Sequence, residues 1–169
     1  MTSLGGSALV PKTHVRIAFR GAIDTLEAEV IEAQVLASEQ RDGKTCAYLG
    51  EVLDLLRLIM AAEVKGTPLP PPFLFGMEAE EIHRLVGEMD WKTSPFPSHT
   101  QGPLAARINT LRAKVREAEL LSVKVFGPQD EAKAAERQDI ILALNRLSSA
   151  LWWLFVETTR ACRAGQNTL

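Results

Sequence analysis

The chain has 169 residues, 46% of them hydrophobic and 24% charged, which is enough for one well-packed domain of average composition. A formal net charge of −2 excludes a global field that would attract nucleic acid or an anionic membrane, but it is compatible with a local cationic pocket. The two cysteines, Cys46 and Cys162, are too few for a disulfide scaffold and have no neighbouring ligands at metal-site spacing.

No targeting or membrane segment is predicted. The longest apolar stretch, around residues 151–156, is too short to span a bilayer. The glycine-rich amino terminus lacks the charged and apolar regions of a signal peptide. We therefore expect a cytoplasmic protein with a single domain over residues 1–169.

Apolar residues recur at alternating steps of three and four along most of the chain, which predicts an all-α protein. The first helix should cover residues 14–40 and the second residues 45–64. Their apolar faces consist of Phe19, Ile23, Leu26, Val30 and Ala33 in the first, and of Cys46, Leu49, Leu53, Leu56 and Met60 in the second.

Two proline-containing loops flank a short third helix. The segment TPLPPPFLFG, residues 67–76, should be the first loop, and residues 77–89 the short helix. The second loop leads to Pro103, well placed as the first residue of a helix that runs to Phe126. After Gly127-Pro128, a fifth helix should start with Asp130 as its cap and continue past Phe155. These elements predict an antiparallel five-helix bundle of four long helices and a shorter one.

Polar residues lie directly beside the apolar stripe of the fourth helix. Arg112, Arg116 and Glu119 each follow a stripe residue and fall within roughly 60° of one another on the helix. One interpretation is a solvated flank with an intrahelical ion pair. The other is a cationic pocket for a polyanion, in which arginine forks grip phosphate oxygens and the carboxylate orients a fork or helps to hold Mg²⁺.

The fifth helix repeats this arrangement. Its apolar stripe is followed, one position on, by a row that contains Asn145, Ser148 and Trp152. A mid-helix asparagine among leucines has poor helix propensity and needs hydrogen-bond partners if it is buried. Two roles are therefore equal alternatives for Asn145: a buried polar residue that fixes the register of the core, and a contact to a ligand. Trp152 and Trp153 are expected in the core or a subunit interface. Arg146 points about 100° away from Asn145 and is expected to be structural.

The amino-terminal residues 1–13 form a Ser/Gly-rich lead that ends at Lys12 and Thr13. A flexible strand or loop with free backbone N–H groups could wrap phosphates, and a disordered tail is the alternative. The sequence contains no Walker loop, GxGxxG, zinc motif or Ser-His-Asp constellation at recognisable spacing.

Four blocks in order, TSLGGSALVPK, RIAFRGAIDTLEA, LAARINTLRAKVREAE and ILALNRLSSALW, resemble the corrinoid adenosyltransferases, which transfer the 5′-deoxyadenosyl group of ATP to cobalamin. The resemblance spans nearly the whole chain. It is strongest to the ethanolamine-utilization type, through IMAAEVKGTPL, EEIHRL, NTLRAKVREAE and RQDIILALNRLSS, and it extends to the propanediol-utilization type.

The resemblance assigns roles to individual residues. The residues that it implies are Asp24, Arg112 and Arg116 as catalytic, Ser3, Lys12, Arg116, Glu119 and Asn145 as ATP-binding, and Phe96 as corrinoid-binding. Asp24 would pair with Arg112, and Arg116 would grip phosphates. Phe96, with Trp91 as a further candidate, would form an apolar wall on the lower face of the corrin ring. His99 stands where many relatives have proline.

The family's mechanism makes cobalt(I) the nucleophile toward the ribose C5′, with triphosphate as the leaving group. The implied substrates and cofactors are ATP, cobalamin and Mg²⁺, and a reductase would supply cobalt(I). Relatives of the propanediol type are homotrimers with active sites between subunits, so we expect a homo-oligomer, with a trimer favoured. For the ethanolamine type a bacterial microcompartment is a further location.

Two stretches that are usual in the family do not occur in the sequence. One is a Thr-Gly-Asp stretch before the Thr-Ser-Leu block, and the other is the cysteine-rich metal-binding segment that the ethanolamine-utilization type usually has upstream of it. We therefore expect weaker ATP affinity than in full-length relatives and no metal requirement tied to those cysteines. Glu27 replaces a common asparagine and would add negative charge near the phosphate site. The alternatives are a non-catalytic corrinoid-binding or delivery bundle, and a bundle used only for protein interaction.

Overall fold

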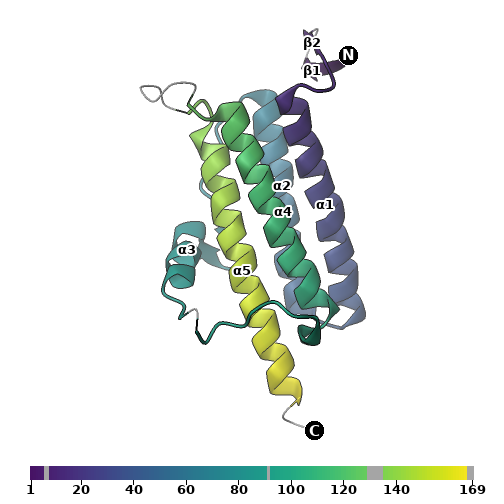
Figure 1. The fold of residues 1–169 in the computed structure, drawn as a ribbon, viewed down its shortest axis with the longest axis vertical. Helices are drawn as coiled ribbons and strands as arrows, with labels where there is room; N and C mark the ends of the chain where they lie inside the picture. Colours follow the sequence, from purple (N-terminus) through teal and green to yellow (C-terminus); the bar gives the residue numbers. More distant parts are fainter. Residues whose placement is uncertain (6–7, 91, 129–134, 167–169) are drawn as a thin grey trace.

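The computed structural model describes residues 1–5, 8–90, 92–128 and 135–166, and this part of the chain is largely helical (Figure 1). It contains the α-helices α1 (Val15–Glu39), α2 (Gly43–Lys65), α3 (Ala79–Gly87), α4 (Pro103–Phe126) and α5 (Gln138–Gln166), and a short 3-10 helix η1 (His99–Gln101). The all-α prediction of four long helices and a shorter one is confirmed.

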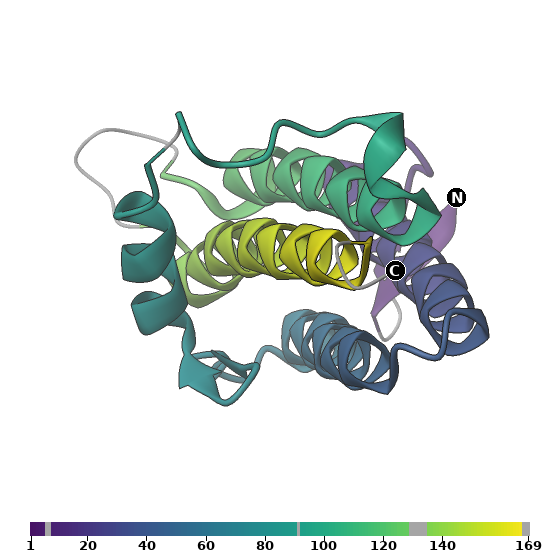
Figure 2. The same ribbon diagram turned by 90° about the horizontal axis from the view of Figure 1, so that it is seen from below.

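The four long helices lie side by side, with α3 outside them against α5 (Figures 1 and 2). The pairs α1–α2, α1–α4 and α4–α5 make the main contacts of the bundle. The predicted apolar stripes form its core: in α1, α4 and α5 every stripe residue is buried. In α2, Cys46 and Met60 are only partly buried and pack at the edge of this core. The period of the apolar residues therefore identified the inner face of each long helix.

The helix ends follow local capping chemistry. The ring of His14 accepts a hydrogen bond from the backbone N–H of Arg16 and caps α1, and the carboxylate of Asp42 caps α2. Pro103 is the first residue of α4, as predicted. The predicted start of α5 is wrong, because residues 135–137 are not helical and the helix begins at Gln138. Asp130, the expected cap, lies outside the described residues.

Helix α5 is more apolar than its longest uninterrupted apolar run suggests. Within the described chain, the stretch Gln138–Arg160 is long and apolar enough to cross a membrane by length and composition. Half of its most apolar window is buried inside the bundle, where α5 packs against α4 and α3. This is the composition of a core helix that is covered on several sides.

Two small antiparallel hairpins accompany the helices. In the amino-terminal segment β1 (Thr2–Gly5) pairs with β2 (Ala8–Val10), so the segment is not simply extended. In the first proline loop β3 (Phe73–Leu74) pairs with β4 (Met77–Glu78), so the prediction that residues 67–76 form only a loop is wrong.

The turn of the second hairpin is stabilised from outside. Phe75 and Gly76 both have positive φ, 58° and 79°, as a two-residue hairpin turn requires. Phe75 is buried against Tyr48 and stacks on Trp153, and its backbone N–H donates to the carboxylate of Glu51. Long-range packing thus holds a phenylalanine in a conformation that its local sequence disfavours.

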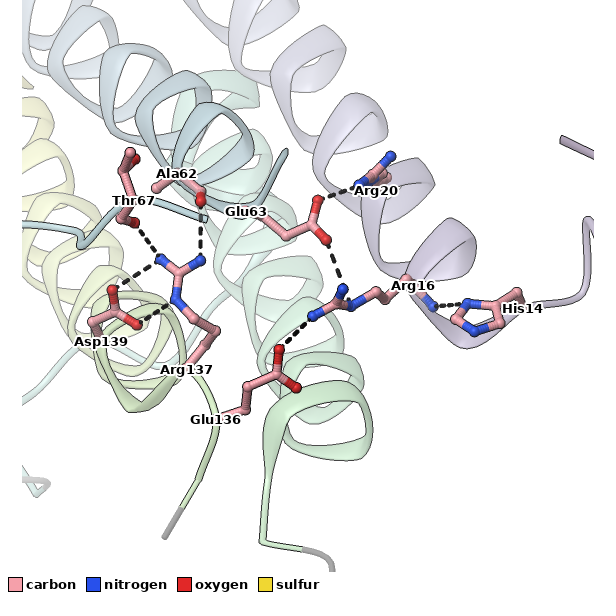
Figure 3. A network of polar contacts seen from close by, with 9 residues as sticks. All are labelled: His14, Arg16, Arg20, Ala62, Glu63, Thr67, Glu136, Arg137 and Asp139. Carbon is pink, nitrogen blue, oxygen red and sulfur yellow. Dashed lines mark hydrogen bonds and ion pairs between the residues drawn. The ribbon is translucent and has the colours of Figure 1, made fainter. Parts of the chain in front are cut away.

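A network of charged side chains, which we call the end lock, joins three helices at one end of the bundle (Figure 3). It comprises Arg16, Arg20, Glu63, Glu136, Arg137 and Asp139. The side chain of Glu63 is 1% exposed and accepts a 2.6 Å hydrogen bond from Nε of Arg20. Arg137 donates to Asp139 and to the carbonyl oxygens of Ala62 and Thr67 at the end of α2.

Candidate functional site

A groove of about 440 Å³ lies between α4, α5 and the segment that leads from α3 to α4. Its volume is within the range of small-molecule sites. We call it the α4–α5 groove, and its lining residues are Val86, Phe96, Pro97, Arg112, Arg116, Ser148, Ser149 and Trp152. The predicted edges of the two helices therefore face one cavity.

The two polar rows meet in antiparallel register. Arg112 of α4 lies over the ring of Trp152 of α5, with the guanidinium carbon 5.2 Å from the ring centroid. Two turns further along α4, Oε1 of Glu119 accepts a 2.8 Å hydrogen bond from Nδ2 of Asn145. Arg116 lies between these contacts on α4 and lines the groove. The groove thus has a cationic wall that ends at an amide and a carboxylate.

Within the described part of the chain, the arginines of this wall lack acidic partners. Among the described residues, no carboxylate lies within ion-pair distance of Arg112 or Arg116, so the intrahelical ion pair of the first interpretation is not formed. Nε of Arg112 donates to the side-chain oxygen of Asn109, at 3.2 Å. Burial, and then repulsion from Arg116, lower the pKa of Arg112. A bound anion would relieve this repulsion.

Asn145 is half-buried and makes hydrogen bonds at both ends of its carboxamide. Nδ2 donates to Glu119, and Oδ1 accepts a 2.5 Å hydrogen bond from Nη1 of Arg146. The residue therefore lies at the edge of the α4–α5 contact, one turn from the groove residues Ser148 and Ser149, rather than within the apolar core. The hydrogen bond to Glu119 joins α5 to α4, and the ligand contact of Asn145 stays a prediction.

Phe96 is the aromatic residue predicted to face the corrin ring. It is 73% exposed, and it also lines a second hollow of about 180 Å³ together with Val86, Met89 and Trp152. The side-chain amide of Gln101 donates to the carbonyl oxygen of Phe96 at 2.9 Å, which ties the residue to η1. An exposed phenyl ring on an anchored loop beside a cavity is suited to contact a large apolar ligand.

Other predicted residues lie away from the groove in a single chain. Asp24 is on the exposed side of α1, and no ion pair joins it to Arg112 in the described part of the chain. Ser3 is in β1, and exposed Lys12 precedes α1. The amino-terminal hairpin lies at the end of the bundle where α1 begins, whereas the segment between α3 and α4 crosses α5 nearer the other end (Figure 1). Trp91 lies outside the described residues.

Glu27 has a basic partner on the neighbouring helix. Its carboxylate forms an ion pair with Arg57 of α2, at 3.6 Å, and its side chain is 23% exposed. The expectation that this glutamate adds negative charge near the phosphate site stays a prediction.

Trp152 is a groove residue that sequence reasoning missed, as are Val86, Pro97 and Ser149. The sequence favoured the core or a subunit interface for it, but the structure places its half-buried ring on the groove beneath Arg112. The signal was available, because Trp152 is in the same helical row as Asn145 and Ser148. Trp153, in contrast, packs on Phe75 and Tyr48, as expected for a core residue.

The match to known families supplies the identification. The cobalamin adenosyltransferase family matches residues 1–158, which is nearly the whole chain. The chain belongs to this family. It is also 31% identical over 160 residues to the corrinoid adenosyltransferases EutT of Escherichia coli (strain K12) and of Salmonella typhimurium (strain LT2). These matches confirm the resemblance to the ethanolamine-utilization type.

These alignments cover 92% of this chain but only 57% of the length of the curated relatives. No solved structure matches it. The family and the fold are therefore established, and the groove described above is the site to which an adenosyltransferase-type reaction can be assigned as a proposal.

Proposed function

We propose that the protein transfers the 5′-deoxyadenosyl group of ATP to the cobalt(I) of a reduced corrinoid. The electron pair of cobalt(I) forms the bond to C5′, the C5′–oxygen bond breaks, and triphosphate leaves with the electron pair of that broken bond. The observation that carries the proposal is the pair of arginines on the groove wall, Arg112 and Arg116, which have no acidic partner among the described residues. A leaving polyanion needs such preorganised positive charge.

The protein's tasks in this reaction are alignment and charge stabilisation, because the nucleophile belongs to the corrinoid. Arg112 and Arg116 would hold the triphosphate. Asn145 would contact the nucleotide beside them, and Phe96 and Trp152 would provide apolar surface for the corrin ring.

The site also fits a phosphate-bound Mg²⁺. One oxygen of Glu119 accepts from Asn145, which leaves the other oxygen for a ligand. Mg²⁺ in nucleotide sites is commonly held by one or two carboxylates together with substrate phosphates. Glu119 would therefore supply the protein's oxygen ligand, and the ion would help to neutralise the triphosphate.

A homo-oligomer, with a trimer favoured, would complete the site. Among the described residues no ion pair joins Asp24 to Arg112, and the amino-terminal hairpin lies at the end of the bundle where α1 begins (Figure 1). A second copy that placed its α1 and amino-terminal segment against the groove would bring Asp24 to Arg112 and Lys12 to the phosphates. A reductase would supply the cobalt(I).

The decisive assay supplies the purified protein with ATP, Mg²⁺ and chemically reduced cobalamin and follows adenosylcobalamin by its absorbance. Formation of adenosylcobalamin with equimolar triphosphate supports the proposal, and its absence contradicts it. Calorimetry separates the alternative function, because binding of cobalamin without binding of ATP would indicate a corrinoid-delivery module.

A charge-reversal cycle tests the predicted pair across subunits. Asp24→Arg should impair turnover, and the second change Arg112→Asp should restore part of it, because the double variant rebuilds an ion pair with its signs exchanged. Additive losses in kcat/KM would argue against this pair.

A further inference from the structure

Arg146 follows Asn145 on α5, and its guanidinium reaches in two directions. Nη1 donates to Oδ1 of Asn145 at 2.5 Å, and Nε donates to Oε1 of Glu80 on α3 at 2.7 Å. The side chain of Arg146 is only 16% exposed. It thus connects the asparagine beside the groove to the helix that packs outside the bundle.

These contacts give the Asn145 carboxamide a single orientation. A guanidinium can only donate hydrogen bonds and an ionised carboxylate can only accept them. Oδ1 must therefore face Arg146, and Nδ2 must face Glu119. One N–H of the amide then remains to donate to a ligand. Without Arg146, the carboxamide could rotate and present oxygen or nitrogen to the same ligand.

We propose that Arg146 is a positioning residue of the nucleotide site: it fixes the Asn145 carboxamide with its N–H toward the ligand, and Glu80 of α3 holds Arg146 in place. This inference rests on the proposed function, which names ATP as the ligand. It gives α3 a second task besides its contribution of Val86 to the groove wall. A nearby hydrogen bond between His83 and Ser149, at 2.9 Å, also holds α3 against α5.

A double-mutant cycle tests whether Arg146 acts through Asn145. The variants are Asn145→Ala, Arg146→Ala and the double variant, and the readouts are the Kd of ATP by calorimetry and the melting temperature. Each single change should raise the Kd about tenfold, as expected for a lost hydrogen bond to a charged group. The double variant should bind no more weakly than the weaker single variant. Independent losses that multiply, or an unchanged Kd in Arg146→Ala, would overturn the proposal.

A matched pair on α3 remains informative if Arg146→Ala does not fold. Glu80 and Glu88 both accept from an arginine, at 2.7 and 2.8 Å, and their side chains are 64% and 60% exposed. Of the two, Glu80 is linked to Asn145 through Arg146, whereas Glu88, which directly follows α3, bonds to Arg84. Glu80→Gln should raise the Kd of ATP about two- to threefold, a loss typical of an exposed ion pair, whereas Glu88→Gln should leave it unchanged. Equal values for both variants would contradict the inference.

The two proposals fail separately. Suppose that the wild-type protein binds ATP and the double-mutant cycle is non-additive as predicted, but no adenosylcobalamin forms. The proposed reaction is then wrong, and the role of Arg146 stands. If the protein forms adenosylcobalamin but the cycle is additive, the reaction stands and the role of Arg146 is wrong.

Discussion

The end lock and the α4–α5 groove use the same residue types in opposite ways. In the end lock each arginine faces a carboxylate: Arg16 and Arg20 face Glu63, and Arg137 faces Asp139 (Figure 3). In the groove, Arg112 and Arg116 repel one another and lie beside a cavity. Paired charges at a helix junction fix the bundle, whereas cations that lack an acidic partner at a cavity are available to an anionic ligand. Removing an arginine should therefore cost activity in one region, and removing a carboxylate should cost stability in the other.

The largest expected effect is in the end lock. Glu63→Ala would leave two guanidinium groups without their buried carboxylate and should lower the free energy of unfolding by about 3–5 kcal/mol. Urea denaturation followed by circular dichroism measures this loss. Glu136→Ala is the control, because the Glu136 side chain is 64% exposed and its ion pair with Arg16 should contribute less than about 1 kcal/mol. If Glu63→Ala and Glu136→Ala lowered the free energy of unfolding equally, burial of the carboxylate would not explain the contribution of Glu63.

In the groove, Arg116→Ala should lower kcat/KM for adenosylation about 100-fold, the usual cost of removing one preorganised donor to a developing anion. Its free energy of unfolding should change by less than about 0.5 kcal/mol, because the side chain is exposed. Arg84→Ala, which removes a surface arginine paired with Glu88, is the matched control and should change neither quantity. If Arg116→Ala lost stability but kept its activity, Arg116 would have a structural role like the arginines of the end lock, and its proposed role in catalysis would be wrong.

The pH dependence of stability separates paired from unpaired charge. The hydrogen bond from Arg137 lowers the pKa of Asp139 in the folded state. Its stabilising contribution is therefore present above the unfolded pKa of about 3.9 and is lost as the pH falls through the lower folded value.

Asp139→Asn should therefore cost about 1–3 kcal/mol at pH 7, and the difference from wild type should shrink below about pH 4. Urea unfolding of both proteins at several pH values gives this difference. A difference that stayed constant down to about pH 2, well below that unfolded value, would show that charge on Asp139 is not the cause.

The smallest expected effect concerns the ring beneath Arg112. Trp152→Leu removes the cation–π contact and should weaken binding of tripolyphosphate about two- to fivefold, the range for a partly exposed contact. Calorimetry with tripolyphosphate measures this. Trp153→Leu is the control: it should lower the melting temperature through its lost packing on Phe75 and leave the affinity unchanged. If Trp153→Leu weakened the binding of tripolyphosphate and Trp152→Leu lowered only the melting temperature, the assignment of the two tryptophans would be wrong.

Several features of the site were predictable because they depend on helical period alone. Arg112, Arg116 and Glu119 share an edge of α4, and Asn145 and Ser148 share one on α5, in any helix with this sequence. The structure adds the register between the two edges, which sets Glu119 opposite Asn145 and Arg112 over Trp152. Register depends on which helices are neighbours and how far each has slid along the other, and neither is encoded in the period of one segment.

The sequence by itself thus determined the helices, their buried faces, the proline that begins α4 and the polar rows beside the stripes, because spacing and capping act over a few residues. Only the tertiary structure decided that Glu63 lies between two arginines, that Phe75 adopts a positive φ, and that Arg146 bridges Asn145 and Glu80. In each case the deciding contact joins segments distant in the chain: Glu63 to α1, Phe75 to Tyr48 and Trp153, and Arg146 to α3. The energy of such a contact is gained only when the packed bundle brings the segments within hydrogen-bond or van der Waals distance.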